Sequence, residues 1–101
     1  MNVVDVRVLS EAADDLETGS RFYDARERGI GDEFWDSLLA DIESLLMYAG
    51  VHVKVHGYYR MLAKRFPYAI YYRIRSDVAY VVAVLPLRRN PNWISRRLKK
   101  R

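Results

Sequence analysis

The spacing of hydrophobic residues changes once along the chain, at about Gly50. Before that point, apolar residues recur every three or four positions over residues 11–28 and again after residue 32, as on one face of a helix. After it, the spacing falls to two in three runs, YYRMLAK, YAIYYRI and VAYVVAVL, as expected for β-strands. The pattern predicts two helices followed by a three-stranded β-meander.

The first half of the chain carries start and stop signals for these helices. The opening run VVDVRVL alternates well enough to predict a short first strand, and Ser10 then stands where its side chain can cap a helix over residues 11–28. Gly29 and Gly31 predict a tight turn, and Asp32 stands where it can cap the second helix. These signals predict a helical hairpin.

The C-terminal segment RRNPNWISRRLKKR predicts a short basic helix, because Asn90 can cap it and Pro91 suits its first position. The predicted order is βααβββα. This is an α+β fold in which a helical hairpin packs on a small, mainly antiparallel sheet. A chain of 101 residues suffices for one hydrophobic core, so residues 1–101 are predicted to form a single domain.

Each helix is predicted to bury one apolar stripe, and the last strand is predicted to be interior because both of its faces are apolar. The first helix supplies Ala12, Ala13, Leu16, Phe22 and Tyr23, and the second supplies Phe34, Leu38, Ile42, Leu45, Leu46 and Ala49. Strict alternation places Val78, Tyr80, Val82 and Val84 on one face of the last strand, and Ala79, Val81, Ala83 and Leu85 on the other.

The strand YAIYYRI divides into a core face and an outer face. Alternation gives the core face to Phe66, Tyr68, Ile70, Tyr72 and Ile74, and the outer face to Ala69, Tyr71, Arg73 and Arg75. Matching apolar residues across the preceding hairpin places Arg60 on the same outer face as Tyr71 and Arg73. The sequence therefore predicts a basic, tyrosine-bearing outer face of the sheet.

Composition excludes several kinds of site. Cysteine is absent, which excludes disulfides and thiolate metal sites. Asp5 and Arg7 interrupt the first apolar run, so it does not resemble a signal peptide, and no apolar stretch approaches the roughly 20 residues that span a bilayer. We expect a cytoplasmic protein without membrane contact.

Neither histidine predicts a metal or catalytic site. His52 and His56 are four residues apart, but the valines between and around them predict an extended backbone, on which this spacing does not converge on a metal. Ser10 is interpreted as a cap rather than a nucleophile, since neither histidine has the sequence signature of a triad. No metal and no cofactor are expected.

Charge is distributed unevenly between the two halves of the chain. Residues 1–50 carry 12 acidic side chains against four arginines, whereas residues 51–101 carry 13 basic side chains against Asp77 alone. Such asymmetry indicates a charged partner rather than a particular fold. With seven basic residues in the last 14, the C-terminal segment is the strongest candidate for attracting an acidic protein segment or a nucleic acid.

Three longer segments, FYDARERGIGDEFWDSL, GYYRMLAKRFPYAIYYRI and YVVAVLPLRRNPNWISRRL, cover most of the chain. With the order βααβββα, they resemble the RelE/ParE superfamily of bacterial toxins from type II toxin-antitoxin systems. The resemblance implies a growth inhibitor that a cognate antitoxin neutralises in a toxin-antitoxin hetero-oligomer. RelE-type toxins cleave messenger RNA in the ribosomal A site, whereas ParE-type toxins poison DNA gyrase and do no chemistry themselves.

The resemblance also indicates which residues a nuclease would need. RNA cleavage requires a base for the 2′-hydroxyl, cations around the phosphate and an acid for the leaving oxygen. Some relatives use glutamate and histidine as the base and the acid. Their histidine often follows the last strand, where this chain has Pro86. The one acidic residue after Glu43 is Asp77, in a predicted turn. RelE-type toxins use five positions, which this chain fills with Arg60, Leu62, Ala69, Arg89 (or Arg88) and Ser95, so that only two cations remain.

Three functions remain open from the sequence. The first is a ParE-like toxin that binds a target, with DNA gyrase as the candidate. The second is a ribosome-dependent endoribonuclease that uses Arg60, Arg73 and Arg89 as phosphate clamps. The third is a non-toxic basic module that binds nucleic acid.

The residues expected to contact a target or antitoxin lie on the outer sheet face and in the C-terminal segment. They are Arg60, Tyr71, Arg73, Arg88, Arg89 and Trp93. Trp93 either packs back as a staple of the terminal helix or stands exposed as an interface anchor. An antitoxin segment is expected to lie along the outer sheet face, where it would gain both charge pairing and packing.

Overall fold

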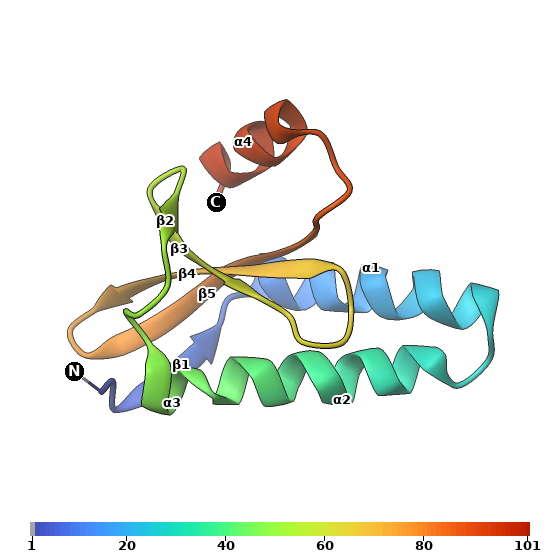
Figure 1. The fold of residues 1–101 in the computed structure, drawn as a ribbon, viewed down its shortest axis with the longest axis horizontal. Coiled ribbons are helices and arrows are strands. Elements are labelled where there is room, and N and C mark those ends of the chain that lie inside the picture. The colour runs from blue at the N-terminus through green and yellow to red at the C-terminus, as the bar shows by residue number, and fades with distance from the viewer. Residues whose placement is uncertain (1) are drawn as a thin grey trace.

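The chain folds into a five-stranded β-sheet with helices on both of its faces (Figure 1). The structure is a computed structural model that describes residues 2–101. Its elements are β1 (Asp5–Val8), α1 (Ser10–Arg26), α2 (Ile30–Glu43), α3 (Leu45–Tyr48), β2 (Lys54–Val55), β3 (Tyr58–Leu62), β4 (Tyr68–Arg75), β5 (Val78–Pro86) and α4 (Pro91–Lys99).

The strand order is β1-β5-β4-β3-β2, with β1 parallel to β5 and the other pairs antiparallel. The predicted α+β class, the mainly antiparallel sheet and the interior position of the last strand are confirmed. The short strand β2 was not predicted. It pairs only with the start of β3, and two residues are too few to produce a recognisable alternation.

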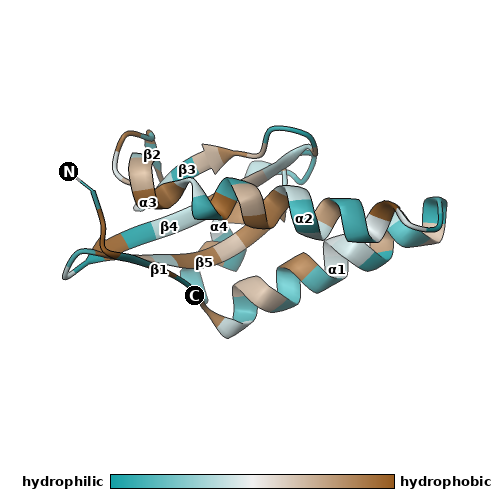
Figure 2. Cartoon of the chain, turned by 90° about the horizontal axis from the view of Figure 1, so that it is seen from below, coloured by the Kyte–Doolittle hydropathy of each residue, from teal (hydrophilic) through white to brown (hydrophobic). Residues whose placement is uncertain are grey.

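The helical hairpin of α1 and α2 covers one face of the sheet, and α4 covers the other. Figure 2 looks from the hairpin side and shows β5 as predominantly hydrophobic, with α4 behind the sheet. Gly19 allows α1 to approach α2 closely, because a Cβ atom at this position would lie 2.5 Å from the Phe34 ring. The hairpin therefore packs tightly before it meets the sheet.

Both predicted side-chain caps, Ser10 and Asp32, are wrong. Each residue already lies inside its helix, and neither helix start has a side-chain cap from the residue before it. Asp24 of α1 caps α2 instead, since its Oδ1 atom accepts hydrogen bonds from the backbone N–H groups of Gly29 (3.0 Å) and Gly31 (2.9 Å). Rules that read only the neighbouring sequence miss an acceptor supplied by another helix.

The predicted apolar stripes are confirmed near the middle of each helix and fail at a few positions. Ala13 and Phe22 are only partly buried, and Leu46 is 44% exposed. Leu46 is exposed because α2 ends at Glu43 and the short α3 follows as a separate helix, so one helical period does not continue. Ile74, predicted for the core, is 37% exposed near the end of β4.

A β-bulge at Val82 shifts the two faces of β5. Tyr72 pairs with Val81 but Tyr71 pairs with Ala83, so Val82 has no opposite residue on β4. Val82 and Ala83 both join the hydrophobic cluster under α4, whereas Val81 belongs to the cluster under the hairpin. The predicted strict alternation along this strand is therefore wrong beyond Val81.

Candidate functional site

The structure divides the six candidate binding residues into two groups. Arg60, Tyr71 and Arg73 lie on β3 and β4, where Arg60 and Tyr71 are opposite each other in the antiparallel register. The other three, Arg88, Arg89 and Trp93, lie in the β5–α4 connection and in α4. Matching the apolar faces across the hairpin had correctly placed Arg60 on the same face as Tyr71.

The outer sheet face is not exposed around Tyr71, which corrects the sequence-based prediction. Tyr71 is 2% exposed, because Ile94 and Leu98 of α4 pack over it together with Leu85. Burial raises the pKa of Tyr71, and the charge of the neighbouring Arg60 partly opposes that rise. A partner can touch Tyr71 only where α4 no longer covers it.

Arg60 and Arg73 occupy the margin of this covered face. Both are half-buried, and the Nε atom of Arg60 is buried without a hydrogen-bond partner among residues 2–101. The guanidinium of Arg73 lies 5.3 Å from the ring centroid of Tyr80. These two arginines are therefore partly available to a partner, but they do not form the continuous basic face that alternation had predicted.

A second group of side chains forms a cleft between α1 and α4, which we call the Phe22–Trp93 cleft. The guanidinium of Arg88 lies 4.5 Å from the Phe22 ring centroid, and those of Arg89 and Arg97 each lie 4.6 Å from the Trp93 centroid. The cleft has a volume of about 200 Å³ and is also lined by α1 and the end of β5. It brings Arg88, Arg89 and Trp93 together.

Trp93 combines the two roles that the sequence left open. It is half-buried and packs against the cluster under α4, yet its ring also lines the cleft. Phe22 and Arg97 were not among the candidate residues. Phe22 had been assigned to the core stripe, and only its partial burial beside α4 shows that it belongs to the cleft.

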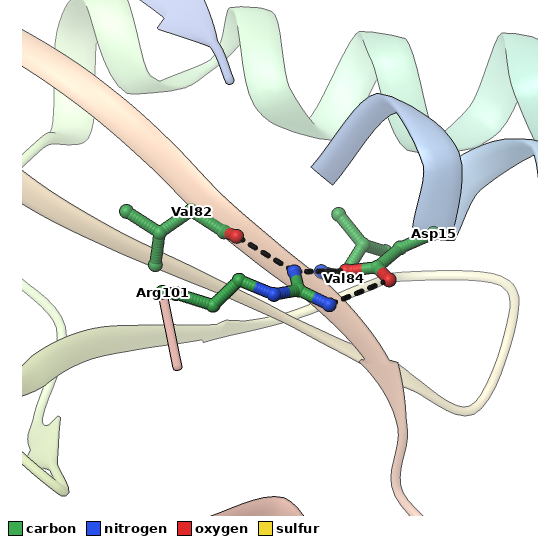
Figure 3. A network of polar contacts seen from close by, with 4 residues as sticks. All are labelled: Asp15, Val82, Val84 and Arg101. Atoms are coloured by element: carbon green, nitrogen blue, oxygen red, sulfur yellow. Dashed lines mark hydrogen bonds and ion pairs between the residues drawn. The ribbon is translucent and has the colours of Figure 1, made fainter. Parts of the chain in front are cut away.

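The one carboxylate that lines this cleft, Asp15, is bound to other groups, as Figure 3 shows. Its Oδ2 atom accepts hydrogen bonds from the Arg101 guanidinium at 2.7 Å and from the backbone N–H of Val84 at 2.9 Å. Arg101 also donates to the carbonyl of Val82 at 2.9 Å, so it satisfies the backbone at the bulge. The side chains of Asp15 and Arg101 are 12% and 7% exposed.

This arrangement offers poor groups for acid-base chemistry. Both carboxylate oxygens of Asp15 already accept hydrogen bonds from Arg101, and Oδ2 also accepts from the Val84 N–H, so the carboxylate is engaged within the fold. Burial raises the pKa of Tyr68, which also lines the cleft, so its hydroxyl stays protonated near neutral pH. Tyr68 is therefore not poised near pH 7 as a general acid or base, and Asp15 is not free to contact a substrate.

Three of the five positions that a RelE-type nuclease would use carry no ionisable side chain, namely Leu62, Ala69 and Ser95. Ala69 is fully buried beneath α4, so an arginine at this position would have to displace the helix. Leu62 is 54% exposed on β3. Ser95 is half-buried on α4 and lines a shallow hollow with His56. These three positions do not provide a base or an acid.

The histidines lie in separate surroundings. The Nδ1 atom of His52 is 2.5 Å from the Tyr72 hydroxyl, and burial lowers the pKa of His52. His56 is in the β2–β3 turn with φ of 54°. Within the described part of the chain, no three His, Asp or Glu side chains come together as a metal site would require.

Comparison with known proteins was informative only at the level of structure. No family model matches the chain, and no curated protein is significantly similar to it in sequence.

No helix within residues 2–101 combines the length and apolar character needed to cross a membrane.

A solved structure described as the chromosomal ParDE TA system from P. aeruginosa contains a chain with a similar fold. The superposition has a TM-score of 0.76 and 13% sequence identity, and it covers 84% of this chain and 97% of the other. The resemblance inferred from the sequence is thus confirmed in its fold. The chain has the fold of a component of that ParDE system.

Proposed function

We propose that the chain is the toxin of a type II toxin-antitoxin system and that it inhibits growth until a cognate antitoxin binds it. The observation that carries this proposal is the fold similarity to a chain of the ParDE TA system, which extends over 97% of that chain. We further propose a ParE-like mode of action, in which the toxin binds a target without chemistry, with DNA gyrase as the first target to test.

The geometry favours binding over RNA cleavage. The three arginines of the nuclease hypothesis do not converge: Arg73 lies near the end of β4, whereas Arg89 follows β5 at the edge where β4 begins. Arg60 faces the middle of β4 from the neighbouring strand. Together with the Asp15–Arg101 pair, which engages the carboxylate that lines the cleft, this separation argues against a shared phosphate clamp.

The proposed antitoxin is an acidic partner that forms a hetero-oligomer with the chain. Arg60 and Arg73, at the margin of α4, are its expected charged contacts. Exchanging both for glutamate should weaken the complex at moderate salt. The pair Arg28→Glu with Lys64→Glu makes the same charge change on exposed residues outside β3 and β4. Equal weakening in both pairs would show that only total charge matters.

Induction of the chain alone in bacteria tests the proposal. We expect growth arrest, loss of DNA supercoiling and no new cleavage sites in translated messages, and we expect co-expression of the antitoxin to restore growth. Normal growth would remove the toxin proposal. Message cleavage in the ribosomal A site, with supercoiling unchanged, would replace the ParE-like mode by the RelE-like one.

A further inference from the structure

Four arginines around the Phe22–Trp93 cleft are held by aromatic rings rather than by carboxylates. Arg26 and Arg88 lie 4.2 and 4.5 Å from the Phe22 centroid, and Arg89 and Arg97 lie at 4.6 Å from that of Trp93. A ring contact orients a guanidinium through its face, but it neither neutralises the charge nor occupies the in-plane N–H groups.

Other arginines of the chain show the contrasting arrangement. Ion pairs neutralise four of them, namely Arg7 with Asp5, Arg21 with Glu17, Arg65 with Glu33 and Arg101 with Asp15. In the part of the chain that the structure describes, Arg88, Arg89 and Arg97 in the cleft and Arg26 at its rim make neither an ion pair nor a side-chain hydrogen bond. The cleft and its rim therefore concentrate guanidinium donors that lie over aromatic rings and have no anionic partner.

The basic surface extends beyond the cleft along α4. A second hollow lies beside Trp93 and is lined by Arg96, Arg97 and Lys100. On the side of α1, Glu11 and Asp14 line a hollow together with Arg97 and Lys100, so negative charge limits the basic surface there. An anion that neutralises the whole surface must follow the line from Phe22 past Trp93 and carry several charges.

We propose that this surface binds the phosphate groups of a single-stranded nucleic acid without cleaving it. Planar guanidinium groups donate paired hydrogen bonds to phosphate oxygens, and a nucleic acid strand supplies one charge per nucleotide along a path. One carboxylate or one free phosphate would leave most of the cleft cations unpaired. This inference does not depend on the toxin function, because it concerns the purified chain alone.

The test is fluorescence anisotropy with a labelled single-stranded DNA of about 12 nucleotides, a length within the range that such surfaces cover. The variant Arg89→Gln with Arg97→Gln keeps Trp93 and removes two cleft cations. Arg28→Gln with Arg75→Gln is the matched control, since both residues are exposed and lie outside the cleft lining. Thermal unfolding of each variant checks that the fold is retained.

We expect the cleft variant to weaken binding by about tenfold or more and to reduce the slope of log K against log salt by about 1.4, that is about 0.7 for each lost phosphate contact. The control should lose no more than about threefold at 0.15 M salt, where charges farther than roughly 8 Å apart are screened. Equal losses in the two variants, or no binding by the unmodified chain, would overturn the proposal.

Two competitors identify the source of the anion. Inorganic phosphate at the same phosphate concentration should not displace the oligonucleotide, because it cannot span the surface; displacement would overturn the assignment to a polymer. Polyglutamate of equal charge should compete more weakly than unlabelled oligonucleotide. Equal competition would assign the surface to an acidic protein segment instead. Neither result affects the toxin proposal, which growth arrest in cells decides.

Discussion

The two faces of the sheet are covered in different ways. Under the hairpin, large rings interlock: Phe34 lies 4.9 Å from Tyr68 and 5.4 Å from Tyr23, measured between ring centroids. Under α4, the sheet presents the small residues Ala69 and Ala83 beside Tyr71, Val82 and Leu85, and α4 adds Ile94 and Leu98. The first face is filled by long helices with aromatic side chains, and the second by one short helix.

The helical hairpin and α4 are held on the sheet by different interactions. A nine-residue helix such as α4 is unstable by itself in water, so it forms only because it docks on the sheet. The buried pair of Arg101 and Asp15 ties the chain just after α4 to α1 and to the bulge on β5. The hairpin should therefore set global stability, whereas α4 should open at a lower free energy.

The largest effect should come from Phe34→Ala on the hairpin side. Phe34 is fully buried and touches rings from α1 and β4, so its removal should lower the free energy of unfolding by about 3–5 kcal/mol. Urea unfolding followed by circular dichroism measures this loss. If Phe34→Ala lowered the free energy of unfolding by less than Leu98→Ala under α4, the hairpin face would not be the more stabilising one.

A smaller loss is expected from Asp15→Ala, which leaves Arg101 and the Val84 N–H without their acceptor. Breaking a buried ion pair on one side costs about 3–5 kcal/mol, and we expect about 3 kcal/mol here because both side chains keep some exposure. The control is Glu17→Ala on the same helix, because its pair with Arg21 is solvent-exposed and should contribute less than about 1 kcal/mol. Equal costs by urea unfolding would mean that the Asp15 pair does not hold α4.

Leu98→Ala should reduce global stability by about 2 kcal/mol, near the lower end of the range for a buried leucine. The cost is small because α4 can detach without unfolding the hairpin. Hydrogen exchange should show that α4 amides open at a lower free energy than α2 amides, both in the unmodified chain and in Leu98→Ala. Equal opening free energies in the two helices would show that the two covers unfold as one unit.

The smallest expected effect is the dependence of stability on pH that comes from the neighbouring residues Tyr71 and Tyr72. Burial raises the pKa of both Tyr71 and Tyr72. Their contribution to stability is present below about pH 10, the ordinary tyrosine pKa, and is lost as the pH rises through the raised pKa of the folded state. Both Tyr→Phe variants should therefore resist alkaline unfolding better than the unmodified chain.

Tyr71 should ionise at a lower pH than Tyr72, because opening of α4 alone exposes Tyr71 to solvent. Tyrosinate absorbance, compared between Tyr71→Phe and Tyr72→Phe, assigns each step. Ionisation of both tyrosines in a single step, coincident with loss of helix, would contradict independent opening of α4.

Local signals were sufficient for most of the elements. The change of hydrophobic period separated the hairpin from the meander, and the N-cap Asn90 with Pro91 gave the start of α4, where the Asn90 side chain accepts from the Trp93 N–H. These features depend on residues a few positions apart, whose geometry the backbone fixes by itself. The resemblance to the RelE/ParE superfamily, which three segments and the order of the elements carry, was also visible in the sequence. The fold similarity confirms it.

The sequence by itself determined the order of the main elements, though not β2 or α3, the shared face of Arg60 and Tyr71, and the core face of β4 except at Ile74. Only the tertiary structure decided that α4 covers Tyr71, that Val82 bulges, and that Phe22 and Trp93 share one cleft. The physical reason is distance along the chain: Asp15 and Arg101 meet across 86 positions. Hydrophobic periodicity reports which side of an element is apolar, but packing decides which element covers it.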